Sequence, residues 1–309
     1  MKKYIIGIDL GGTNLRIGLF DREINLKDKK VFSTRQFNNK ITLINNIVRS
    51  TEDIIKDNYL KKDCILGIGL GVPGPVDYKK QIIHFLPNIK GWFNVPLGKI
   101  LKESLGINNI FIDNDANLVC LAESKMGSAK GYKNVVCITL GTGVGGGLFI
   151  ENKLYRGSNY AAGEIGHIPL YQNGPICSCG AKGCLESYVG NLKIMKEAKK
   201  VFKRDINLEE LSKLAKLKNR KATKIWKNVG EKIGTVLTGV VNLLNPAVIV
   251  IAGGISNAGE ILFKNIRKTI INRAMFIQSK QVKILGSHFK DNAGIIGAAL
   301  LVKMEVGRC

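Results

Sequence analysis

The stretch KYIIGIDLGGTNLRIGLFD, residues 3–21, places two apolar runs on either side of a short glycine turn. The runs 3–12 and 15–21 are rich in β-branched residues, and such runs around a tight turn predict a β-hairpin. The same order returns in NVVCITLGTGVGGGLFI (134–150), where a threonine replaces the acid Asp9 that ends the first run. This repeat predicts a duplicated α/β unit with a cleft between the two copies.

The rest of the chain alternates between further expected strands and helices. Apolar runs predict three more strands, at 64–72, 109–115 and 247–256. Apolar residues at helical spacing predict helices at 41–57, 97–106, 117–127 and 292–302, and a mostly helical region at 191–245. Strands that alternate with helices are typical of the α/β class, in which helices flank mixed sheets.

The composition is that of a globular protein without a membrane span. Of the 309 residues, 45% are hydrophobic and 23% are charged, which is ordinary for globular proteins. The apolar run at the N-terminus is short and interrupted by Asp9, so it predicts a strand rather than a signal peptide. No uninterrupted apolar stretch reaches the ~18 residues of a membrane span. We therefore expect a cytoplasmic protein whose seven cysteines form no disulfide framework.

The net charge of +23 is the unusual feature of the composition. Strongly basic proteins often bind nucleic acid or anionic membranes. Here, however, the lysines are scattered along the chain instead of gathered into one basic arm, and no nucleic-acid-binding motif accompanies them. We therefore expect neither a nucleic-acid nor a membrane partner. A positive field would instead favour an anionic nucleotide as substrate.

Three glycine-rich loops follow apolar strands: DLGGTN (9–14), LGTGVGGG (140–147) and AGGIS (252–256). Successive N–H groups of such loops can cradle phosphate oxygens. The alternative for any one loop is a tight turn that needs positive φ, but three loops together favour nucleotide binding. None is a Walker A or GxGxxG motif, which disfavours P-loop and dinucleotide-binding enzymes. The loop residues expected to contact the nucleotide are Gly11, Gly12, Thr13, Asn14, Gly141, Thr142, Gly143, Gly253 and Gly254.

Two acids lie at the end of the strand expected at 109–115, in FIDNDAN. The two-residue repeat of a strand places Asp113 and Asp115 on one face. A carboxylate held at a strand end can act as a general base. Equally, Asp115 could cap the helix that follows. From the residues alone these two roles of Asp115 stay open, and Asp113 is read as a solvated or supporting acid.

One histidine and three cysteines fall close together, in the pattern His167-x9-Cys177-x-Cys179-x4-Cys184. One nitrogen and three sulfur ligands make a full tetrahedral set for Zn²⁺, and a closed set of this kind is structural. Three reduced cysteines in a loop, or a CxC redox pair, are the alternatives. Free cysteines are usually buried, whereas this loop is polar and glycine-rich, and a redox pair does not account for His167.

Six motifs, DLGGTN, GVPGPVD, DNDAN, LGTGVGGG, AGEIGH and CSCGAKGCLE, follow one another along nearly the entire chain. In this order they resemble the ROK family of sugar kinases, and GWFNVPL (91–97) is similar to the glucokinase branch. The resemblance implies the two-lobed actin-like ATPase (ribonuclease H-like) fold, with duplicated α/β domains and ATP in the cleft. We expect a small lobe at 1–114, completed by the C-terminal helix 292–309, and a large lobe at 115–291 with the zinc-binding loop.

The resemblance also assigns roles near the expected phosphoryl transfer. Asp115 would be the general base that takes the proton of the sugar 6-hydroxyl, and Asn114 would hydrogen-bond neighbouring hydroxyls. Gly74, in GVPGPVD, would let the backbone approach the sugar. Asp9 would help to place Mg²⁺ through water, because Mg²⁺ usually binds one or two carboxylates together with phosphates and waters.

In the family pattern, Glu164, His167 and Glu186 contact the sugar hydroxyls around C1 to C3. His167 would bind zinc through one ring nitrogen and offer the other to the sugar. The zinc would hold the loop in place without touching the phosphate. The sequence departs from the family at Tyr160, where glycine is common, and this change would reshape the rim of the sugar pocket.

The function implied is that of an ATP-dependent hexose 6-phosphotransferase, with glucose as the first candidate and N-acetylmannosamine, fructose or another hexose as alternatives. A non-catalytic sugar-sensing regulator is the rival from another class. Asp115 and the lack of a helix-turn-helix segment before residue 4 count against that rival. We expect a homo-oligomer, a dimer or a tetramer, as in other members of the family.

Overall fold

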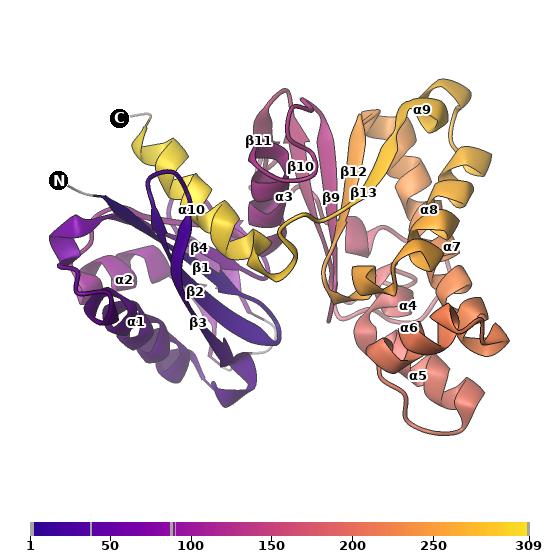
Figure 1. Cartoon of the computed structure of the whole chain (residues 1–309), viewed down its shortest axis with the longest axis horizontal. Coiled ribbons are helices and arrows are strands. Elements are labelled where there is room, and N and C mark those ends of the chain that lie inside the picture. Colours follow the sequence, from indigo (N-terminus) through magenta and orange to yellow (C-terminus); the bar gives the residue numbers. More distant parts are fainter. Residues whose placement is uncertain (1–2, 38, 87–88, 90, 308–309) are drawn as a thin grey trace. The chain divides into compact units, whose positions relative to one another are not determined.

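The computed structural model describes residues 3–37, 39–86, 89 and 91–307 (Figure 1). The chain forms two compact units that interleave in sequence. Unit 1 comprises Met1–Lys125, Leu154–Ala162 and Asp291–Cys309, and unit 2 comprises Met126–Lys153 and Gly163–Lys290. Within the described part of the chain, no helix is both long and apolar enough for a membrane crossing.

A five-stranded sheet forms the centre of unit 1, with the strand order β3-β2-β1-β4-β8. The first three strands are antiparallel and the other two are parallel to β1. Their bounds are β1 Tyr4–Leu10, β2 Asn14–Asp21, β3 Leu26–Ser33, β4 Ile65–Val72 and β8 Ile110–Asn114. The hairpin expected from the opening stretch is therefore confirmed as β1 and β2.

Helices cover both faces of this sheet (Figure 1). They are α1 Lys40–Asp57, α2 Leu97–Leu105, α3 Asp115–Lys125 and α10 Ala293–Val306. Even-numbered residues of β1, such as Ile6 and Ile8, belong to the core with Leu43 and Ile47 of α1. Odd-numbered residues face α10, because side chains alternate along a strand. The amide oxygen of Asn39 caps α1 by accepting a hydrogen bond from the N–H of Thr42 at 3.0 Å.

Unit 2 repeats this arrangement with the strands β10-β9-β12-β13 of a second sheet, whose full order is β11-β10-β9-β12-β13. The order again has an antiparallel hairpin, β9 and β10, with β12 and β13 parallel to β9. The bounds are β9 Val135–Leu140, β10 Val144–Ile150, β11 Lys153–Tyr155, β12 Val248–Ala252 and β13 Lys283–Gly286. The duplicated α/β topology expected from the sequence is thus present in both sheets.

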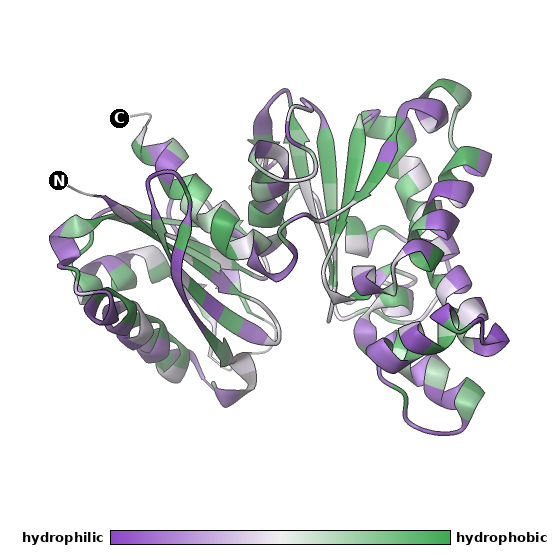
Figure 2. Cartoon of the chain, in the orientation of Figure 1, coloured by the Kyte–Doolittle hydropathy of each residue, from purple (hydrophilic) through white to green (hydrophobic). Residues whose placement is uncertain are grey.

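The helices of unit 2 are α4 Glu186–Val189, α5 Asn191–Phe202, α6 Leu208–Lys216, α7 Arg220–Leu244, α8 Glu260–Arg273 and α9 Phe276–Gln281. The region expected to be mostly helical, 191–245, is confirmed as α5, α6 and α7. Figure 2 shows that the central strands are largely hydrophobic, whereas most helices alternate between hydrophobic and hydrophilic residues. The longer helices of unit 2 therefore bury one apolar side against the sheet or a neighbouring helix.

Some short elements have no counterpart in the sequence analysis. A three-stranded sheet in unit 1 consists of β5 Val76–Asp77, β6 Ile82–Phe85 and β7 Phe93–Val95. Single 3-10 turns lie at η1 Thr34–Gln36, η2 Lys62–Cys64, η3 Ile165–His167, η4 Gly254–Ala258 and η5 Lys290–Asn292. Strands of two to four residues are too short to produce a readable alternation.

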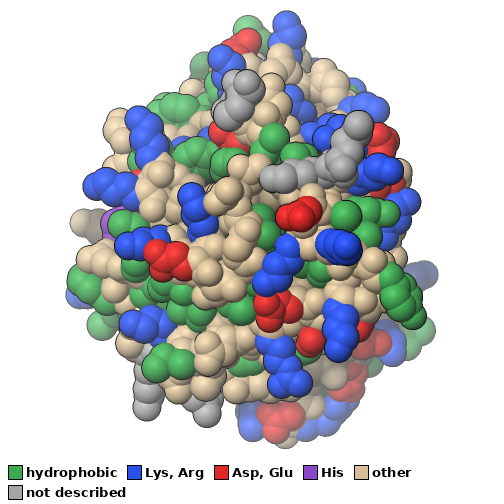
Figure 3. Space-filling model, turned by 90° about the vertical axis from the view of Figure 1, so that its left-hand side faces the viewer, with side chains coloured by type: hydrophobic (Ala, Val, Ile, Leu, Met, Phe, Trp, Pro, Cys, Tyr) green, Lys and Arg blue, Asp and Glu red, His purple; other side chains and the backbone are tan. Residues whose placement is uncertain are grey.

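The lysine and arginine side chains are spread over the face seen in Figure 3, with acidic, apolar and other side chains between them. The scattered lysines of the sequence thus correspond to a dispersed positive charge on this face.

Glycines let the backbone of α10 lie directly against the sheet of unit 1. A Cβ on Gly7 of β1 would lie 2.1 Å from the carbonyl oxygen of Ile295, and one on Gly69 of β4 would lie 2.0 Å from that of Ala298. Within α10, a Cβ on Gly297 would lie 1.9 Å from the carbonyl oxygen of Leu118 in α3. Glycine inside a strand marks such close approach of another backbone.

We predict that Gly69→Ala destabilises the protein, by about 1–3 kcal/mol or more, because the added methyl group meets backbone that cannot rotate away. Urea denaturation followed by circular dichroism measures the effect. Gly239→Ala is the control, because a Cβ at this helical position meets nothing within 4 Å. The control should be neutral or stabilising by up to ~1 kcal/mol. Equal stability of the Gly69 variant and the wild type would contradict the packing argument.

Candidate functional site

The corner between β8 and α3 carries the expected catalytic acid. The strand ends at Asn114, and Asp115 is the first residue of the helix. The side-chain oxygen of Asn114 accepts hydrogen bonds from the N–H groups of Ala116 at 3.0 Å and of Asn117 at 3.3 Å. Asn114 therefore occupies the cap position that the sequence left open for Asp115. The expectation that Asp113 and Asp115 share a strand face is wrong, because the helix begins between them.

The same asparagine connects this corner to Gly74. The amide nitrogen of Asn114 donates a hydrogen bond to the carbonyl oxygen of Gly74 at 3.3 Å. Gly74 has φ +98°, and a Cβ there would lie 2.7 Å from the carbonyl oxygen of Phe85. Only glycine fits this position. The structure thus brings together three of the residues named from the sequence, Gly74, Asn114 and Asp115.

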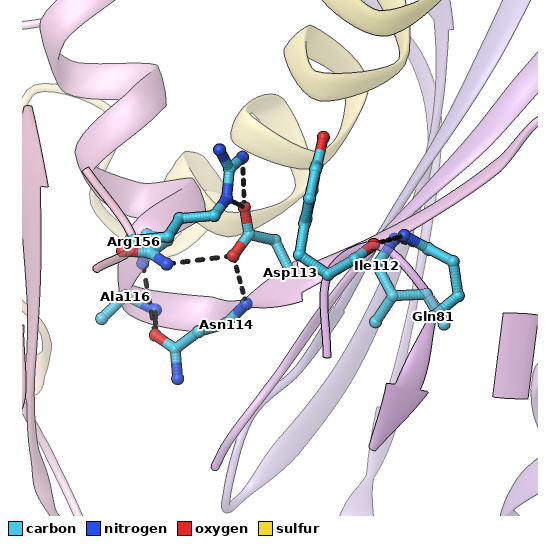
Figure 4. Close-up of polar contacts among 8 residues, drawn as sticks. Gln81, Ile112, Asp113, Asn114, Ala116 and Arg156 are labelled. Atoms are coloured by element: carbon cyan, nitrogen blue, oxygen red, sulfur yellow. Dashed lines mark hydrogen bonds and ion pairs between the residues drawn. The ribbon is translucent and has the colours of Figure 1, made fainter. Parts of the chain in front are cut away.

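Asp113 is a buried acid with a partner that the sequence analysis missed (Figure 4). Its side chain is 3% exposed, and Nε and Nη2 of Arg156 lie 2.8 and 2.7 Å from its Oδ2. Its Oδ1 accepts hydrogen bonds from the backbone N–H of Asn114 at 2.8 Å and from the amide of Asn117 at 2.9 Å. The guanidinium of Arg156 also stacks on Tyr78, 3.9 Å from the ring centroid. Asp113 is therefore a supporting acid, not a solvated one.

Asp9 lies at the end of β1 and close to a second missed cation. Arg16 is its cross-strand neighbour in β2, with Nη1 3.6 Å from Oδ2 of Asp9. Burial raises the pKa of Asp9 to about 7, and the neighbouring charge of Asp115 adds to this effect, while Arg16 opposes it. A Cβ on Gly294 would lie 2.4 Å from the carboxyl carbon of Asp9. Asp9 and Asp115 both lie beside Gly71, where a Cβ would be 3.7 Å from Oδ1 of Asp9 and 3.4 Å from Cα of Asp115. Carboxylates are donors that suit Mg²⁺.

Two of the three glycine loops, 9–14 and 140–147, differ from the positive-φ turns considered as their alternative. Gly11, Gly12, Gly141 and Gly143 all lack a positive φ. For Gly141, a Cβ would also meet nothing within 4 Å. Neither backbone conformation nor packing therefore requires glycine at position 141, which leaves room for the close approach of a ligand.

The other residues of the three loops lie at the strand ends where they were expected. Gly11, Gly12 and Thr13 form the turn between β1 and β2, and Asn14 begins β2; Thr142 lies in the turn between β9 and β10. Gly253 is a packing glycine, with φ +85° and a Cβ position 2.3 Å from the carbonyl oxygen of Leu140. Gly254 begins η4, and a Cβ there would meet nothing within 4 Å.

The segment that carries Glu164 and His167 lies directly on β10 of unit 2. A Cβ on Gly146 would lie 2.2 Å from the carbonyl oxygen of Gly163, and one on Gly166 would lie 2.1 Å from that of Val144. The backbone of this segment can therefore touch the strand, and His167 follows at the end of η3.

The four expected metal ligands come together in unit 2. The ligand atoms of His167, Cys177, Cys179 and Cys184 all lie within 4.8 Å of one another. The sulfur atoms of Cys179 and Cys184 are 3.7 Å apart, and that of Cys177 is 3.6 Å from Nδ1 of His167. Zinc with bonds of ~2.3 Å to sulfur and ~2.0 Å to nitrogen needs edges of about 3.8 and about 3.5 Å. The donor set therefore fits a tetrahedral zinc ion, which would be held by these four residues.

His167 directs its two ring nitrogens to different partners. Nδ1 faces Cys177, whereas Nε2 lies 3.8 Å from a carboxylate oxygen of Glu164. Burial raises the pKa of Glu164; His167 opposes this shift and the charge of Glu186 adds to it. The glutamate is 49% exposed and therefore accessible to a ligand.

Glu186 joins two segments of unit 2. Its Oε2 accepts a hydrogen bond from the backbone N–H of Val144 at 2.9 Å, and its Oε1 accepts one from the hydroxyl of Ser178 at 3.0 Å. Val144 directly follows the glycine turn 141–143, and Ser178 lies between two of the cysteine ligands. Glu186 is thus more than a surface acid, because both of its oxygens hold neighbouring loops.

Comparison with known proteins places these motifs in a family. The sequence profile described as the ROK family matches residues 5–305. The chain belongs to the ROK family. A glucokinase of Thermotoga maritima is 31% identical to it over 99% of both chains. A xylose repressor of Caldicellulosiruptor bescii is 30% identical over 96% of this chain and 77% of its own length.

A solved structure agrees with the ROK assignment. The ROK glucokinase from Streptomyces griseus, in complex with glucose and AMPPNP, superposes with a TM-score of 0.87 at 27% identity, covering 97% of this chain and 99% of that one. The two-lobed actin-like ATPase class expected from the motifs is therefore confirmed. The ROK family includes both kinases and repressors, so the family alone does not decide the function.

We predict that Arg156→Met destabilises this ROK protein by about 3–5 kcal/mol, because it leaves the buried charge of Asp113 without a counterion. Chemical denaturation of the two single variants and of Arg156→Met/Asp113→Asn completes a double-mutant cycle. The double variant should lose clearly less free energy of unfolding than the two single variants lose in sum. Arg49→Met, which changes an 84% exposed arginine, is the control and should cost under ~0.5 kcal/mol. Additive costs would show that the pair is not coupled.

The pKa of Asp9 predicts how stability changes with pH. The folded-state pKa of about 7 lies above the ordinary value of 3.8, so the contribution of Asp9 is complete below pH ~4 and is lost as the pH rises to ~7. Asp9→Asn removes the ionisable group, so the variant does not lose this stability as the pH rises. The stability advantage of the variant over the wild type should therefore grow between pH 4 and pH 8, by up to about 4 kcal/mol. A difference that stays constant across this range in urea denaturation would contradict the burial of an ionisable Asp9.

Proposed function

We propose that the protein is an ATP-dependent hexose kinase that phosphorylates the 6-hydroxyl of its sugar, with glucose as the first candidate. The observation that carries the proposal is the corner of unit 1 in which Asn114, Gly74 and Asp115 lie together and in which Asp9 and Asp115 both lie next to Gly71. Support comes from the glucokinase relative that matches the whole chain and from the S. griseus structure with glucose and AMPPNP.

Asp115 would act as the general base. It accepts the proton of the 6-hydroxyl while the hydroxyl oxygen bonds to the γ-phosphorus of ATP and the bond from that phosphorus to the bridging oxygen breaks, which releases ADP. Phosphoryl transfer depends mainly on positioning and charge stabilisation. The supports are present, because Asn114 caps α3 and Asp113 is held by Arg156 next to this corner.

The phosphate groups would be held by the glycine turns of the two hairpins, with Asp9 placing Mg²⁺. When bound, the ion neutralises phosphate charge. Asp9 keeps part of its proton near neutral pH in the free protein, because its pKa is about 7. A cation at this carboxylate favours the ionised form, so binding of the metal nucleotide would release a proton.

The sugar hydroxyls around C1 to C3 would form hydrogen bonds with Glu164, His167 and Glu186. Carboxylates accept strong hydrogen bonds from pairs of neighbouring hydroxyls. The oxygens of Glu186 have further lone pairs beyond those used by Val144 and Ser178. A zinc ion bound by His167 and the three cysteines would hold the loop in place. Nε2 of His167 would not bind the zinc, because it faces Glu164.

We predict that Asp115→Asn lowers kcat by about 10²–10⁴ while the sugar still binds, because the amide keeps the shape but accepts no proton. Stopped-time assays give kcat, and isothermal titration calorimetry gives the sugar Kd, which should stay within about threefold. Asp53→Asn, at an exposed acid of α1, is the control and should keep full activity. Normal turnover by the Asp115 variant would remove Asp115 from the reaction.

A panel of sugars tests the proposed reaction itself. Coupled ADP release with Mg-ATP is measured for glucose, N-acetylmannosamine, N-acetylglucosamine, fructose, mannose and allose. One sugar with a kcat/KM far above the rest would identify the substrate. The xylose repressor relative makes a sugar-sensing regulator the second candidate. No turnover with any sugar, together with salt-sensitive DNA binding, would favour that candidate.

A further inference from the structure

The carboxylate of Glu186 lies between two loops for which different ligands are proposed. One is the turn 141–144, a candidate for nucleotide phosphates, and the other is the loop 177–184 with the cysteine ligands. Oε2 of Glu186 accepts a hydrogen bond from the N–H of Val144 in the first loop. Its Oε1 accepts one from the hydroxyl of Ser178 in the second. All of these residues belong to unit 2, so the link does not depend on the placement of unit 1.

The segment that begins with Glu186 makes two hydrogen bonds to the turn 141–144. Besides the bond from Val144 to Glu186, the N–H of Asn191 donates to the carbonyl oxygen of Gly141 at 3.0 Å. A Cβ on Gly143 would lie 2.5 Å from Oε2 of Glu186. The glycine at position 143 therefore makes room for the carboxylate, and this contact rather than a positive φ explains the residue.

The position of Glu186 depends in turn on the cysteine loop. Cys184 precedes Glu186 by two residues and is 1% exposed. The carbonyl oxygen of Cys184 accepts a hydrogen bond from the N–H of Ser187 at 3.0 Å. Ser178, the other partner of the carboxylate, lies between the ligands Cys177 and Cys179. A metal ion that fixes the cysteines therefore fixes both the backbone that carries Glu186 and the hydroxyl that orients it.

We propose that Glu186 is a positioning residue that couples the metal loop to the nucleotide turn, so that a metal ion in the loop and a nucleotide at the turn stabilise each other. This inference rests on the proposed function. It assigns Glu186 a role beyond contact with the sugar. Coupling between two binding sites is reciprocal. A nucleotide should therefore raise the affinity for the metal by the same factor by which the metal raises the affinity for the nucleotide. We expect the higher metal affinity to appear as slower metal release, because affinity differences lie mostly in the dissociation rate.

The experiment uses the full chain loaded with one equivalent of Zn²⁺. The rate of zinc release to a colorimetric chelator is measured with and without saturating Mg-AMPPNP, whose binding is verified by calorimetry, and no sugar is present. In the wild type we expect AMPPNP to slow release by about tenfold, within the range of about 5–150-fold typical of coupled sites. Mg-AMPPNP should likewise bind about tenfold more weakly to the zinc-free protein.

Three variants at two residues locate the coupling. Ser178→Ala removes one hydrogen bond of the bridge but leaves the four ligands and Glu186 in place, and should reduce the effect of AMPPNP on zinc release to about two- to threefold. Glu186→Ala should abolish the effect, whereas Glu186→Gln should retain part of it, because an amide can still accept from Val144 and donate to Ser178. Ser279→Ala, at a serine whose hydroxyl donates to Phe276 in α9, is the matched control and should behave as the wild type.

The outcomes separate this inference from the proposed function. If AMPPNP binds the zinc-loaded wild type but leaves zinc release unchanged, the inference is overturned and the kinase proposal stands. If the effect is of wild-type size in Ser178→Ala and Glu186→Ala, coupling does not pass through this carboxylate, and the inference is again overturned. Absence of AMPPNP binding would overturn both proposals.

Discussion

Direct contact between the backbone of α10 and the sheet of unit 1 is the constraint on which that unit depends. It is made possible by Gly7 and Gly69 in the strands, where any side chain would collide with carbonyl groups of the helix. Because α10 approaches this closely, Gly294 lies against the carboxylate of Asp9, and Gly297 lies against α3 at Leu118. One packed helix thus contacts the end of β1, which carries Asp9, the acid expected to place Mg²⁺, and also α3, which begins with Asp115, the expected general base.

Unit 2 builds its site by the same physical means. Gly146 and Gly166 bring the segment with His167 onto β10, and Gly143 admits the carboxylate of Glu186. The hydroxyl, backbone and carboxylate contacts around Glu186 then join the cysteine loop to a strand end. In both units the functional side chains are positioned by backbone held against backbone, an arrangement that leaves little freedom to the residues that carry them.

The features that the sequence predicts are those with a local cause. The hairpins, the repeated strand order and the cluster of His167 with three cysteines follow from alternation, helical spacing and ligand chemistry. The ion pair of Asp113 with Arg156 does not, because 43 residues separate the partners and the arginine has no neighbouring signal. The cap of α3 stays open from the sequence, since two adjacent polar residues, Asn114 and Asp115, are both suited to that position. The reason for Gly143 is not local either, because a Cβ there would meet the carboxylate of Glu186, 43 residues further along the chain.

The interleaving of the two units in sequence has a consequence for synthesis on the ribosome. Unit 2 is built from Met126–Lys153 and Gly163–Lys290, and so leaves the ribosome before α10 is made. Unit 1 begins before unit 2 and is completed after it, since β1 and β4 acquire α10 only from Ala293–Val306. During translation α3 can already pack on the glycine-lined face of the first sheet, but the part that α10 covers stays exposed. That exposed part is open to contacts with other chains until α10 has been synthesised.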